Sequence, residues 1–217
     1  FAYTVDGGHF GELETECFNA YSALVTFTGK ATHTGTARAG GMVNAVNIAG
    51  RFVESIPVTE RPETTFGYEG FFAVLEIKGS VEKTSVSMIL RDFTSAGMEK
   101  RIETVRKLAE SAALSFGGVA EVSFSEQYKN MKSALEKNPL VVENLVKAYE
   151  ESGITPVFVP IRGGTDGSRL SEIGIPTPNI FTGGHNYHSR NEWASLDQMS
   201  AATDVLINLA QKVAETK

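Results

Sequence analysis

Apolar and polar residues alternate along several stretches of this chain and so predict strands. The alternation covers residues 19–30, 71–78, 84–92 and 119–128, as expected where every second side chain faces a core. Apolar residues recur at helical spacing over 42–56 and 95–116, which predicts a helix in each place. The resulting order over residues 19–128, β-α-β-β-α-β, is that of a ferredoxin-like α+β domain with both helices on one face of an antiparallel sheet.

The rest of the chain has shorter predicted elements. A helix is predicted after Asn138-Pro139, where Asn can cap and Pro suits the first turn. Another helix is predicted over 196–213, and strands at 1–5, 156–161 and 176–181. Two or three strands cannot make a stable sheet with both faces covered. We therefore expect residues 1–18 and 129–217 to be segments of one α/β domain with a mixed sheet, into which the domain 19–128 is inserted.

The first predicted strand also bears on the extent of the protein. It begins at Phe1 without a polar lead-in, and natural domains rarely start inside a buried strand. We therefore expect the chain to be a piece of a longer protein.

Charge and composition exclude some classes of partner. With 20 Lys and Arg against 26 Asp and Glu, the net charge is −6, and no basic tract is present. Because nucleic acid and anionic lipid both require clustered positive charge, we expect neither as a partner. No apolar run approaches the roughly 20 residues that cross a bilayer. The single cysteine, Cys17, is expected to be a small buried side chain in a reducing, cytoplasmic compartment.

The stretch FTGGHNYHSRNEW at 181–193 holds the first candidate for a metal ligand. His188 lies in a Gly-containing loop with Glu192 four residues later. An imidazole can bind zinc when a second group orients its other nitrogen. The alternative is an ordinary surface histidine, which is the commoner case. His185 has no partner pattern of its own and is assigned to the loop.

Asp6 is the second candidate, because it ends a predicted strand and precedes Gly7 and Gly8. Functional carboxylates are often placed at strand ends in α/β folds, and glycines allow a ligand to approach the backbone closely. The alternative is an Asp that starts a turn, which is the commoner role of Asp before Gly.

Three further features carry weaker signals. RGGTDG at 162–167 follows a strand and opens a short helix, so its free amides could bind an anion. It lacks the spacing of the known nucleotide-binding loops, so nucleotide binding is unsupported. Arg91 lies near the end of a strand, and His33 lies in a loop rich in Thr and Gly. Each could be a surface group, with Arg91 paired to Asp92 or another carboxylate.

Together these features resemble one family over the whole chain. The segments YTVDGG, GELE, NAYS, MVNA, GYEGF, LRDF, RGGTDG and PNIFTGG occur in the order in which they are found in the peptidase T family. That family comprises tripeptide aminopeptidases of the co-catalytic di-zinc metallopeptidase clan. The resemblance implies a zinc-peptidase catalytic α/β domain with an inserted ferredoxin-like lid or dimerisation domain. It also implies a hydrolase that releases the N-terminal residue of tripeptides with the help of two zinc ions.

The resemblance further implies roles for single residues. Asp6 matches the aspartate that binds one zinc, and His188 matches the histidine that binds the other. His33 matches a lid histidine that helps to stabilise the tetrahedral oxyanion. Arg91 matches a lid arginine that grips a substrate carboxylate.

The turn RGGTDG matches a family turn near the substrate carboxylate, so Gly164 and Thr165 are implied to bind substrate. The chain departs from the family beside two of these positions. Thr34 stands where Pro often follows the lid histidine, and His185 stands where Tyr is usual. Both are flanking changes that leave the implied roles in place.

Other parts of the family's site do not occur in these 217 residues. Family members supply an H-x-D motif and a Glu-Glu pair before the YTVDGG strand. No H-x-D is present here, and Glu150-Glu151 is better interpreted as solvated charge at a helix end. We therefore expect this chain alone to bind zinc weakly and not to hydrolyse peptides.

Two other functions stay open. The chain could be a non-catalytic binding or dimerisation module, or a related di-zinc hydrolase that acts on dipeptides or acylated amino acids. The expected partners are short peptide substrates and a second copy of the chain, which could pair through the sheet edge of the lid.

Overall fold

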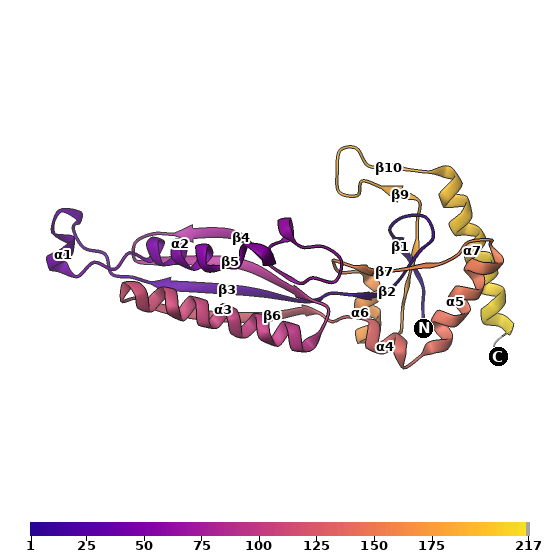
Figure 1. Ribbon diagram of the computed structural model, residues 1–217, viewed down its shortest axis with the longest axis horizontal. Coiled ribbons are helices and arrows are strands. Elements are labelled where there is room, and N and C mark those ends of the chain that lie inside the picture. The colour runs from indigo at the N-terminus through magenta and orange to yellow at the C-terminus, as the bar shows by residue number, and fades with distance from the viewer. Residues whose placement is uncertain (216–217) are drawn as a thin grey trace. The chain divides into compact units, whose positions relative to one another are not determined.

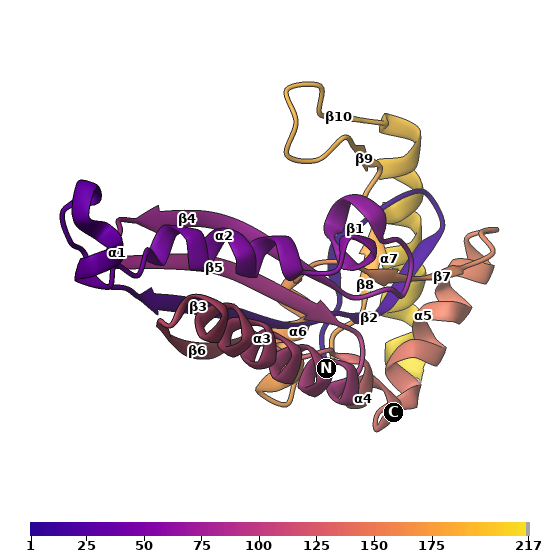
Figure 2. The ribbon, with the colours of Figure 1, turned by 60° about the vertical axis from the view of Figure 1, so that its left-hand side comes forward.

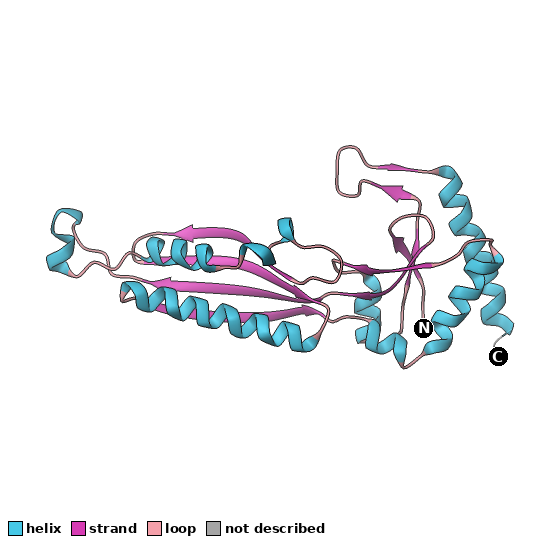
Figure 3. Ribbon diagram, viewed as in Figure 1, coloured by secondary structure: helices cyan, strands magenta, loops and turns pink. Residues whose placement is uncertain are grey.

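The computed structural model describes residues 1–215. It divides into two compact units. Unit 1 comprises residues 1–18 together with the chain from Tyr128 onward, and unit 2 comprises Asn19–Gln127. Each unit has a sheet and helices of its own. Figure 3 shows the helices in cyan and the strands in magenta.

Unit 2 is built on a sheet whose strands lie in the order β4-β5-β3-β6. β5 pairs antiparallel with both of its neighbours, β3 and β4. Helices α2 and α3 run along the same side of this sheet in both views (Figures 1 and 2). The structure confirms the predicted β-α-β-β-α-β order. The bounds are β3 (Asn19–Thr28), α1 (Ala37–Gly40), α2 (Ala45–Ser55), β4 (Phe71–Gly79), β5 (Lys83–Asp92), α3 (Ser95–Phe116) and β6 (Val119–Tyr128), with short 3-10 turns η1 (Thr34–Thr36), η2 (Val58–Glu60) and η3 (Pro62–Thr64).

The apolar side chains of unit 2 form one continuous core between the sheet and its helices. Along β3, Val25 and Phe27 are buried, whereas Leu24 between Ala23 and Val25 is exposed. This alternation is the pattern of a sheet with one covered face. Full burial of one such side chain contributes roughly 1.5–3 kcal/mol. The helices complete the core with Ala45, Ile48, Ala49, Phe52, Met98, Val105, Ala109, Ala112 and Ala113.

Unit 1 has a sheet of mixed direction in the order β1-β8-β2-β7. β1 is parallel to β8, β8 is antiparallel to β2, and β2 is parallel to β7. This mixed sheet and its helices confirm the predicted α/β class. The bounds are β1 (Thr4–Gly7), β2 (Glu12–Cys17), α4 (Lys132–Glu136), α5 (Pro139–Glu151), β7 (Val157–Ile161), α6 (Asp166–Glu172), β8 (Asn179–Phe181), β9 (Gly184–His185), β10 (Trp193–Ala194) and α7 (Leu196–Glu215).

Two smaller apolar clusters hold unit 1 together. In the first, Leu13, Ile180 and Phe181 of the strands contact side chains of α5 and α7. The second contains Cys17 and Met131 together with Leu135 and Val141. Burial raises the pKa of the Cys17 thiol to about 11, so this cysteine is the inert apolar side chain that the sequence predicts.

The structure corrects several predicted details. The first strand is Thr4–Gly7 rather than 1–5, and alternation does not predict β2, α4 or the β9-β10 hairpin. Thr94 caps α3, one residue before the predicted helix, since its hydroxyl accepts a hydrogen bond of 3.0 Å from the Gly97 amide. Asn138 does not cap α5 with its side chain, which instead donates to the Ala134 carbonyl at 2.8 Å. Within residues 1–215, no helix has the length and apolar character of a membrane span.

Candidate functional site

Asp6 lies in a β-bulge at the end of β1. Val5 pairs with Ile180 and Gly7 pairs with Phe181, so Asp6 is the additional residue between two consecutive pairs. A bulge of this kind turns the side chain of the extra residue away from the regular strand direction. Gly7 makes the bulge possible, because a Cβ there would lie 2.7 Å from the carbonyl oxygen of Ile180. The Asp6 side chain is consequently exposed at the strand end.

His188 lies in the loop that connects β9 and β10. Its φ is 61°, in the left-handed region that non-glycine residues seldom adopt. The Glu192 carboxylate accepts a hydrogen bond of 3.1 Å from the His188 amide and so holds this backbone turn. Glu192 thus orients the loop backbone, and the His188 ring is exposed.

The direction of the strands places Asp6 and His188 at one edge of the unit 1 sheet. Edge here means the side of the sheet formed by strand ends, not an outer strand. Because β1 and β8 are parallel, their carboxyl ends meet at the same edge, and the loop that carries His188 follows β8. Ligand sites of α/β folds are commonly found at such an edge. A carboxylate and an imidazole are both donors that zinc accepts. Within residues 1–215, no group of three or more His, Cys, Asp or Glu could hold a metal ion.

An aromatic cluster lies beside these two residues and was not singled out by sequence pattern. His185 stacks on Trp193 with ring centroids 4.1 Å apart and planes inclined by 16°. The His185 Nε2 lies 2.9 Å from Gln198 Oε1. The centroid of the His9 ring lies 5.6 Å from that of the His185 ring. His185 therefore belongs to the β9-β10 hairpin, where it pairs with Trp193, and is not a free loop residue. No local spacing in the sequence indicates this pairing.

Thr165 begins α6 and belongs to a buried polar network. Its hydroxyl accepts a hydrogen bond of 3.2 Å from the Gly167 amide and so caps the helix. The Asn179 amide, 1% exposed, donates to Thr165 Oγ1 at 2.9 Å and to Glu14 Oε2 at 3.1 Å. Asn179 Oδ1 also contacts the Thr4 hydroxyl. One side chain thus joins the RGGTDG turn to β1 and β2.

The same topology separates the RGGTDG turn from the edge that carries Asp6. β7 is parallel to β2, and β2 is antiparallel to β8, so the turn after β7 leaves the sheet at the opposite edge. Gly164 in this turn packs against Tyr128, whose ring would lie 2.7 Å from an added Cβ. The structure therefore brings Asp6 and His188 to one edge and Gly164 and Thr165 to the other.

Glu14 is a buried carboxyl group that the sequence candidates did not include. It is 8% exposed, and burial raises its pKa from the ordinary 4.5 to about 7. The charges of Glu12 and Asp6 act in the same direction, whereas hydrogen bonds from Asn179 and Gly8 oppose them. A possible signal was present: Glu12, Glu14 and Glu16 alternate with Leu13, Thr15 and Cys17 in the sequence.

In unit 2, His33 caps the short turn η1. Its Nδ1 accepts a hydrogen bond of 3.1 Å from the Gly35 amide. An accepting Nδ1 carries no proton, so the neutral ring has its proton on Nε2. The ring is exposed, so its Nε2–H is available as a hydrogen-bond donor.

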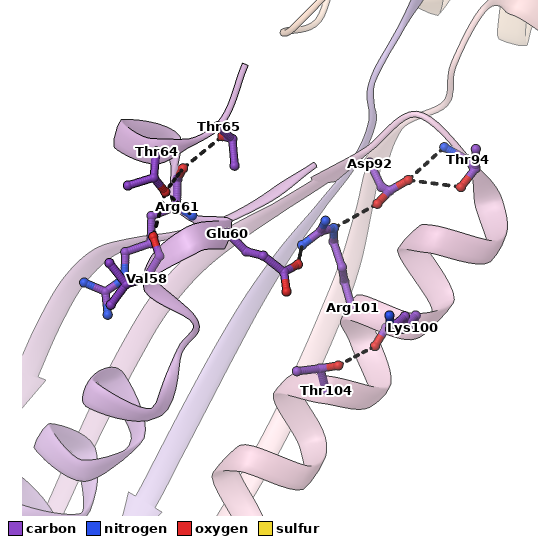
Figure 4. A network of polar contacts seen from close by, with 10 residues as sticks. All are labelled: Val58, Glu60, Arg61, Thr64, Thr65, Asp92, Thr94, Lys100, Arg101 and Thr104. Carbon is purple, nitrogen blue, oxygen red and sulfur yellow. Dashed lines mark hydrogen bonds and ion pairs between the residues drawn. The ribbon is translucent and has the colours of Figure 1, made fainter. Parts of the chain in front are cut away.

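Arg91 lies on the face of the unit 2 sheet that the helices leave open. It pairs with Ala20 across β3, and its Nη1 donates to Gln127 Oε1 at 3.1 Å. The neighbouring Asp92 forms a separate network with Arg101 (Figure 4), in which Arg101 Nε lies 2.9 Å from Asp92 and Nη1 lies 2.7 Å from Glu60. Asp92 also accepts hydrogen bonds from Thr94 at the start of α3. The network fixes the end of β5 that carries Arg91.

The fold and these donors define a class: an α/β unit interrupted by a ferredoxin-like unit, with candidate donors of the metallohydrolase type. The model of the peptidase family M20/M25/M40 matches residues 14–212. The chain belongs to this family.

Relatives and solved structures agree with this assignment. A curated relative, Peptidase T from Clostridium perfringens (strain SM101 / Type A), is 48% identical over 99% of this chain. The alignment covers 53% of that relative, so the chain spans about half the length of the curated relatives it matches.

Among solved structures, a tripeptidase from Staphylococcus aureus subsp. aureus Mu50 has a TM-score of 0.85 at 19% identity, covering 99% of this chain and 57% of that chain. Aminopeptidase PepT from Bacillus cereus ATCC 10987 has a TM-score of 0.82 at 22% identity, covering 98% and 57%. A dinuclear metal-binding M20 peptidase from Bacillus subtilis has a TM-score of 0.69 at 15% identity, covering 100% and 58%. These three likenesses concern the fold.

Proposed function

We propose that this chain is part of a cytoplasmic, zinc-dependent aminopeptidase that releases the N-terminal residue of tripeptides. The observation that carries the proposal is the family match over 14–212, together with 48% identity to a protein named Peptidase T along nearly the whole chain. The exposed donors Asp6 and His188 at one sheet edge support it. The single, buried Cys17 agrees with a reducing compartment.

In this proposal Asp6 and His188 each bind one of two zinc ions. Bound zinc would polarise the scissile carbonyl and lower the pKa of a bound water. His33 would donate its Nε2–H to the oxyanion that develops on the carbonyl oxygen. The hydrogen bond between His33 Nδ1 and the Gly35 amide supports this role, because it keeps the proton on Nε2.

Three further residues are assigned to substrate binding in this proposal. The Arg91 guanidinium would bind a peptide carboxylate, since its planar donors match a carboxylate in two places. Gly164 and Thr165 lie in the turn that begins α6, at the sheet edge opposite the two proposed metal ligands, so they would contact a part of the substrate away from those ligands. The network through Asn179 supports a fixed position for this turn.

One zinc ligand for each ion is insufficient, because zinc sites in proteins usually have three or four protein ligands. We propose that the remaining ligands and the general base are supplied by polypeptide outside these 217 residues. The chain alone should then bind zinc weakly and hydrolyse no peptide.

The test compares this chain with the complete reading frame that encodes it. Zinc content and hydrolysis of di-, tri- and tetrapeptides are measured for both. We expect zinc-dependent cleavage of the tripeptide by the longer protein only, and its loss in His188→Asn. The matched control is His9→Asn, which should stay active. Tight stoichiometric zinc and tripeptide turnover by the chain alone would contradict the missing-ligand proposal, and a preference for dipeptides or acylated amino acids would favour the related hydrolase.

We propose a second copy of the chain as a partner of unit 2. β4 is an edge strand, and its residues Leu75 and Ile77 are 63% and 49% exposed. An exposed edge strand offers free backbone groups to another strand. In antiparallel pairing of two β4 strands centred on Ile77, Glu76 of each copy would face Lys78 of the other copy. Opposite charges at facing positions favour such pairing.

A charge swap tests this edge. Glu76→Lys alone would face Lys78 of the second copy and should shift the chain toward the monomer in sedimentation equilibrium. The double variant Glu76→Lys with Lys78→Glu restores opposite pairs and should restore the dimer. A monomeric wild type, or a double variant no better than the single one, would reject this interface.

A further inference from the structure

The loop that carries His188 is attached to the end of β1 by one tyrosine. The Tyr187 hydroxyl donates to the Gly7 carbonyl at 3.3 Å, between residues 180 positions apart in the chain. The Thr182 hydroxyl lies 3.4 Å from the same carbonyl and contacts the Tyr187 hydroxyl. Gly7 is the residue directly after Asp6, so this contact joins the Asp6 bulge to the His188 loop.

The backbone on both sides of Tyr187 adopts an uncommon conformation. Both neighbours have positive φ, 56° at Asn186 and 61° at His188. Such conformations are uncommon for residues other than glycine and persist only where the surroundings enforce them. Hydrogen bonds within the loop do so: Asn186 Nδ2 donates to the Asn191 carbonyl at 3.3 Å, and the His188 amide donates to Glu192 at 3.1 Å.

Gly184 provides the space for the tyrosine ring. A Cβ at this position would lie 2.4 Å from the Tyr187 hydroxyl oxygen and 2.5 Å from a ring carbon. Any larger residue would therefore displace the ring from Gly7. The Gly184 amide also donates to Thr182 Oγ1 at 2.9 Å, which holds the second hydroxyl of the cluster in place.

We propose that Tyr187 is a positioning residue that fixes the His188 loop against the Asp6 bulge. Its hydroxyl contacts the Gly7 carbonyl and the Thr182 hydroxyl, and it acts through them. By holding Gly7 and the loop together, it sets the separation of the two side chains assigned to metal. This consequence rests on the proposed function, whereas the attachment of the loop does not.

The first test uses this chain and needs no metal. Tyr187→Phe keeps the ring and removes the hydroxyl, so we expect amide exchange in residues 183–192 to become about ten-fold faster, as for a segment that opens locally. Gly184→Ala leaves the hydroxyl but displaces the ring, and should have the same effect. Tyr21→Phe is the matched control, because its hydroxyl binds Glu126 at 2.6 Å in unit 2. Unchanged exchange over 183–192 in both loop variants would overturn the proposal.

The second test uses the longer protein. We expect Tyr187→Phe to weaken zinc binding by about 10-fold, as for outer groups that orient metal ligands. kcat should fall while KM stays the same, and added zinc should restore kcat. A purely structural role would instead lower the amount of folded enzyme without dependence on zinc. If the wild type shows no zinc-dependent hydrolysis, the proposed function fails, and the exchange result still decides the role of Tyr187.

Discussion

Different kinds of internal contact stabilise unit 1 and unit 2. Unit 2 has long strands and one continuous apolar core, to which both helices contribute. Unit 1 has short strands, two smaller apolar clusters and a set of buried polar side chains that includes Glu14, Thr177 and Asn179. The difference indicates that apolar packing fixes the backbone of unit 2, whereas polar contacts set the strand ends of unit 1. Those strand ends carry Asp6 and the His188 loop.

The largest expected effect tests the apolar core of unit 2. Phe52 of α2 is fully buried, with its ring 5.6 Å from that of Phe27. Phe52→Ala should lower the free energy of unfolding by about 3–5 kcal/mol, because it removes apolar contacts and leaves a cavity. Urea unfolding followed by circular dichroism measures this loss. Phe66→Ala is the control: Phe66 is 76% exposed and should change stability by less than about 0.5 kcal/mol.

Fluorescence sharpens this test, since Trp193 is the one tryptophan of the sequence and lies in unit 1. If the two units unfold independently, Phe52→Ala should not change the urea midpoint measured by Trp193 fluorescence. A shift of that midpoint equal to the shift in circular dichroism would show that the cores are coupled. Equal stability of the Phe52 and Phe66 variants would contradict the role given to the core.

The second prediction concerns pH and unit 1. The pKa of Glu14 is raised in the folded state, from 4.5 to about 7, so the folded chain keeps a proton that the unfolded chain releases. Stability should therefore fall as pH rises from about 4.5 to 7, by an amount on the order of 3 kcal/mol. Glu14→Gln should remove this fall, measured as urea midpoints of Trp193 fluorescence at several pH values. Glu54→Gln, at an exposed position, should keep it; the same slope in Glu14→Gln would refute the assignment.

The third prediction removes the centre of the polar network. Asn179→Ala removes one hydrogen-bond partner from each of Thr165, Thr4 and Glu14, and the loss of a buried hydrogen bond costs about 1–3 kcal/mol. We expect a total loss of about 2–3 kcal/mol in unit 1, followed by Trp193 fluorescence. Asn47→Ala on the exposed side of α2 serves as control. A loss no larger than that of the control would show that apolar contacts alone hold the unit 1 sheet.

The smallest predicted effect concerns the polar network of unit 2 (Figure 4). Arg101 is buried, pairs with Asp92 and Glu60, and covers the Phe72 ring at 4.8 Å. Arg101→Met keeps apolar contact with that ring but leaves Asp92 without its cation, so we expect a loss of about 1–2 kcal/mol, reduced by the exposure of Glu60. Arg51→Met, which breaks an exposed pair with Glu54, should cost almost nothing. A loss greater than that of Phe52→Ala would show that polar contacts contribute more than apolar packing to the stability of unit 2.

The elements of unit 2 follow from the sequence because their pattern is long and regular. Strands β3, β5 and β6 run for ten residues each, long enough for alternation to be distinct from chance. β2 has only six residues, and Leu13 and Cys17 are its apolar members. Its alternation is therefore too short and too weak to predict a strand, and no pattern in the sequence shows that Glu14 is buried.

The identities of the candidate residues came from the sequence, and their arrangement did not. Asp6, His188, His33, Arg91, Gly164 and Thr165 could all be selected from motifs, and the structure places the first two at one edge of the unit 1 sheet. The strand directions that carry Gly164 and Thr165 to the opposite edge are not encoded in any local spacing. Neither is the stack of His185 on Trp193.

The sequence by itself thus determined which segments form helices and strands in unit 2, the α/β class of the remainder and the candidate metal-binding side chains. Only the tertiary structure decided that Asp6 is presented by a bulge, that Asn179 joins three elements and that Tyr187 attaches its loop to Gly7. The physical reason is the distance along the chain over which each kind of interaction acts. Periodicity and turn chemistry act over a few residues, whereas these contacts join residues up to 180 positions apart and exist only once the sheet has formed.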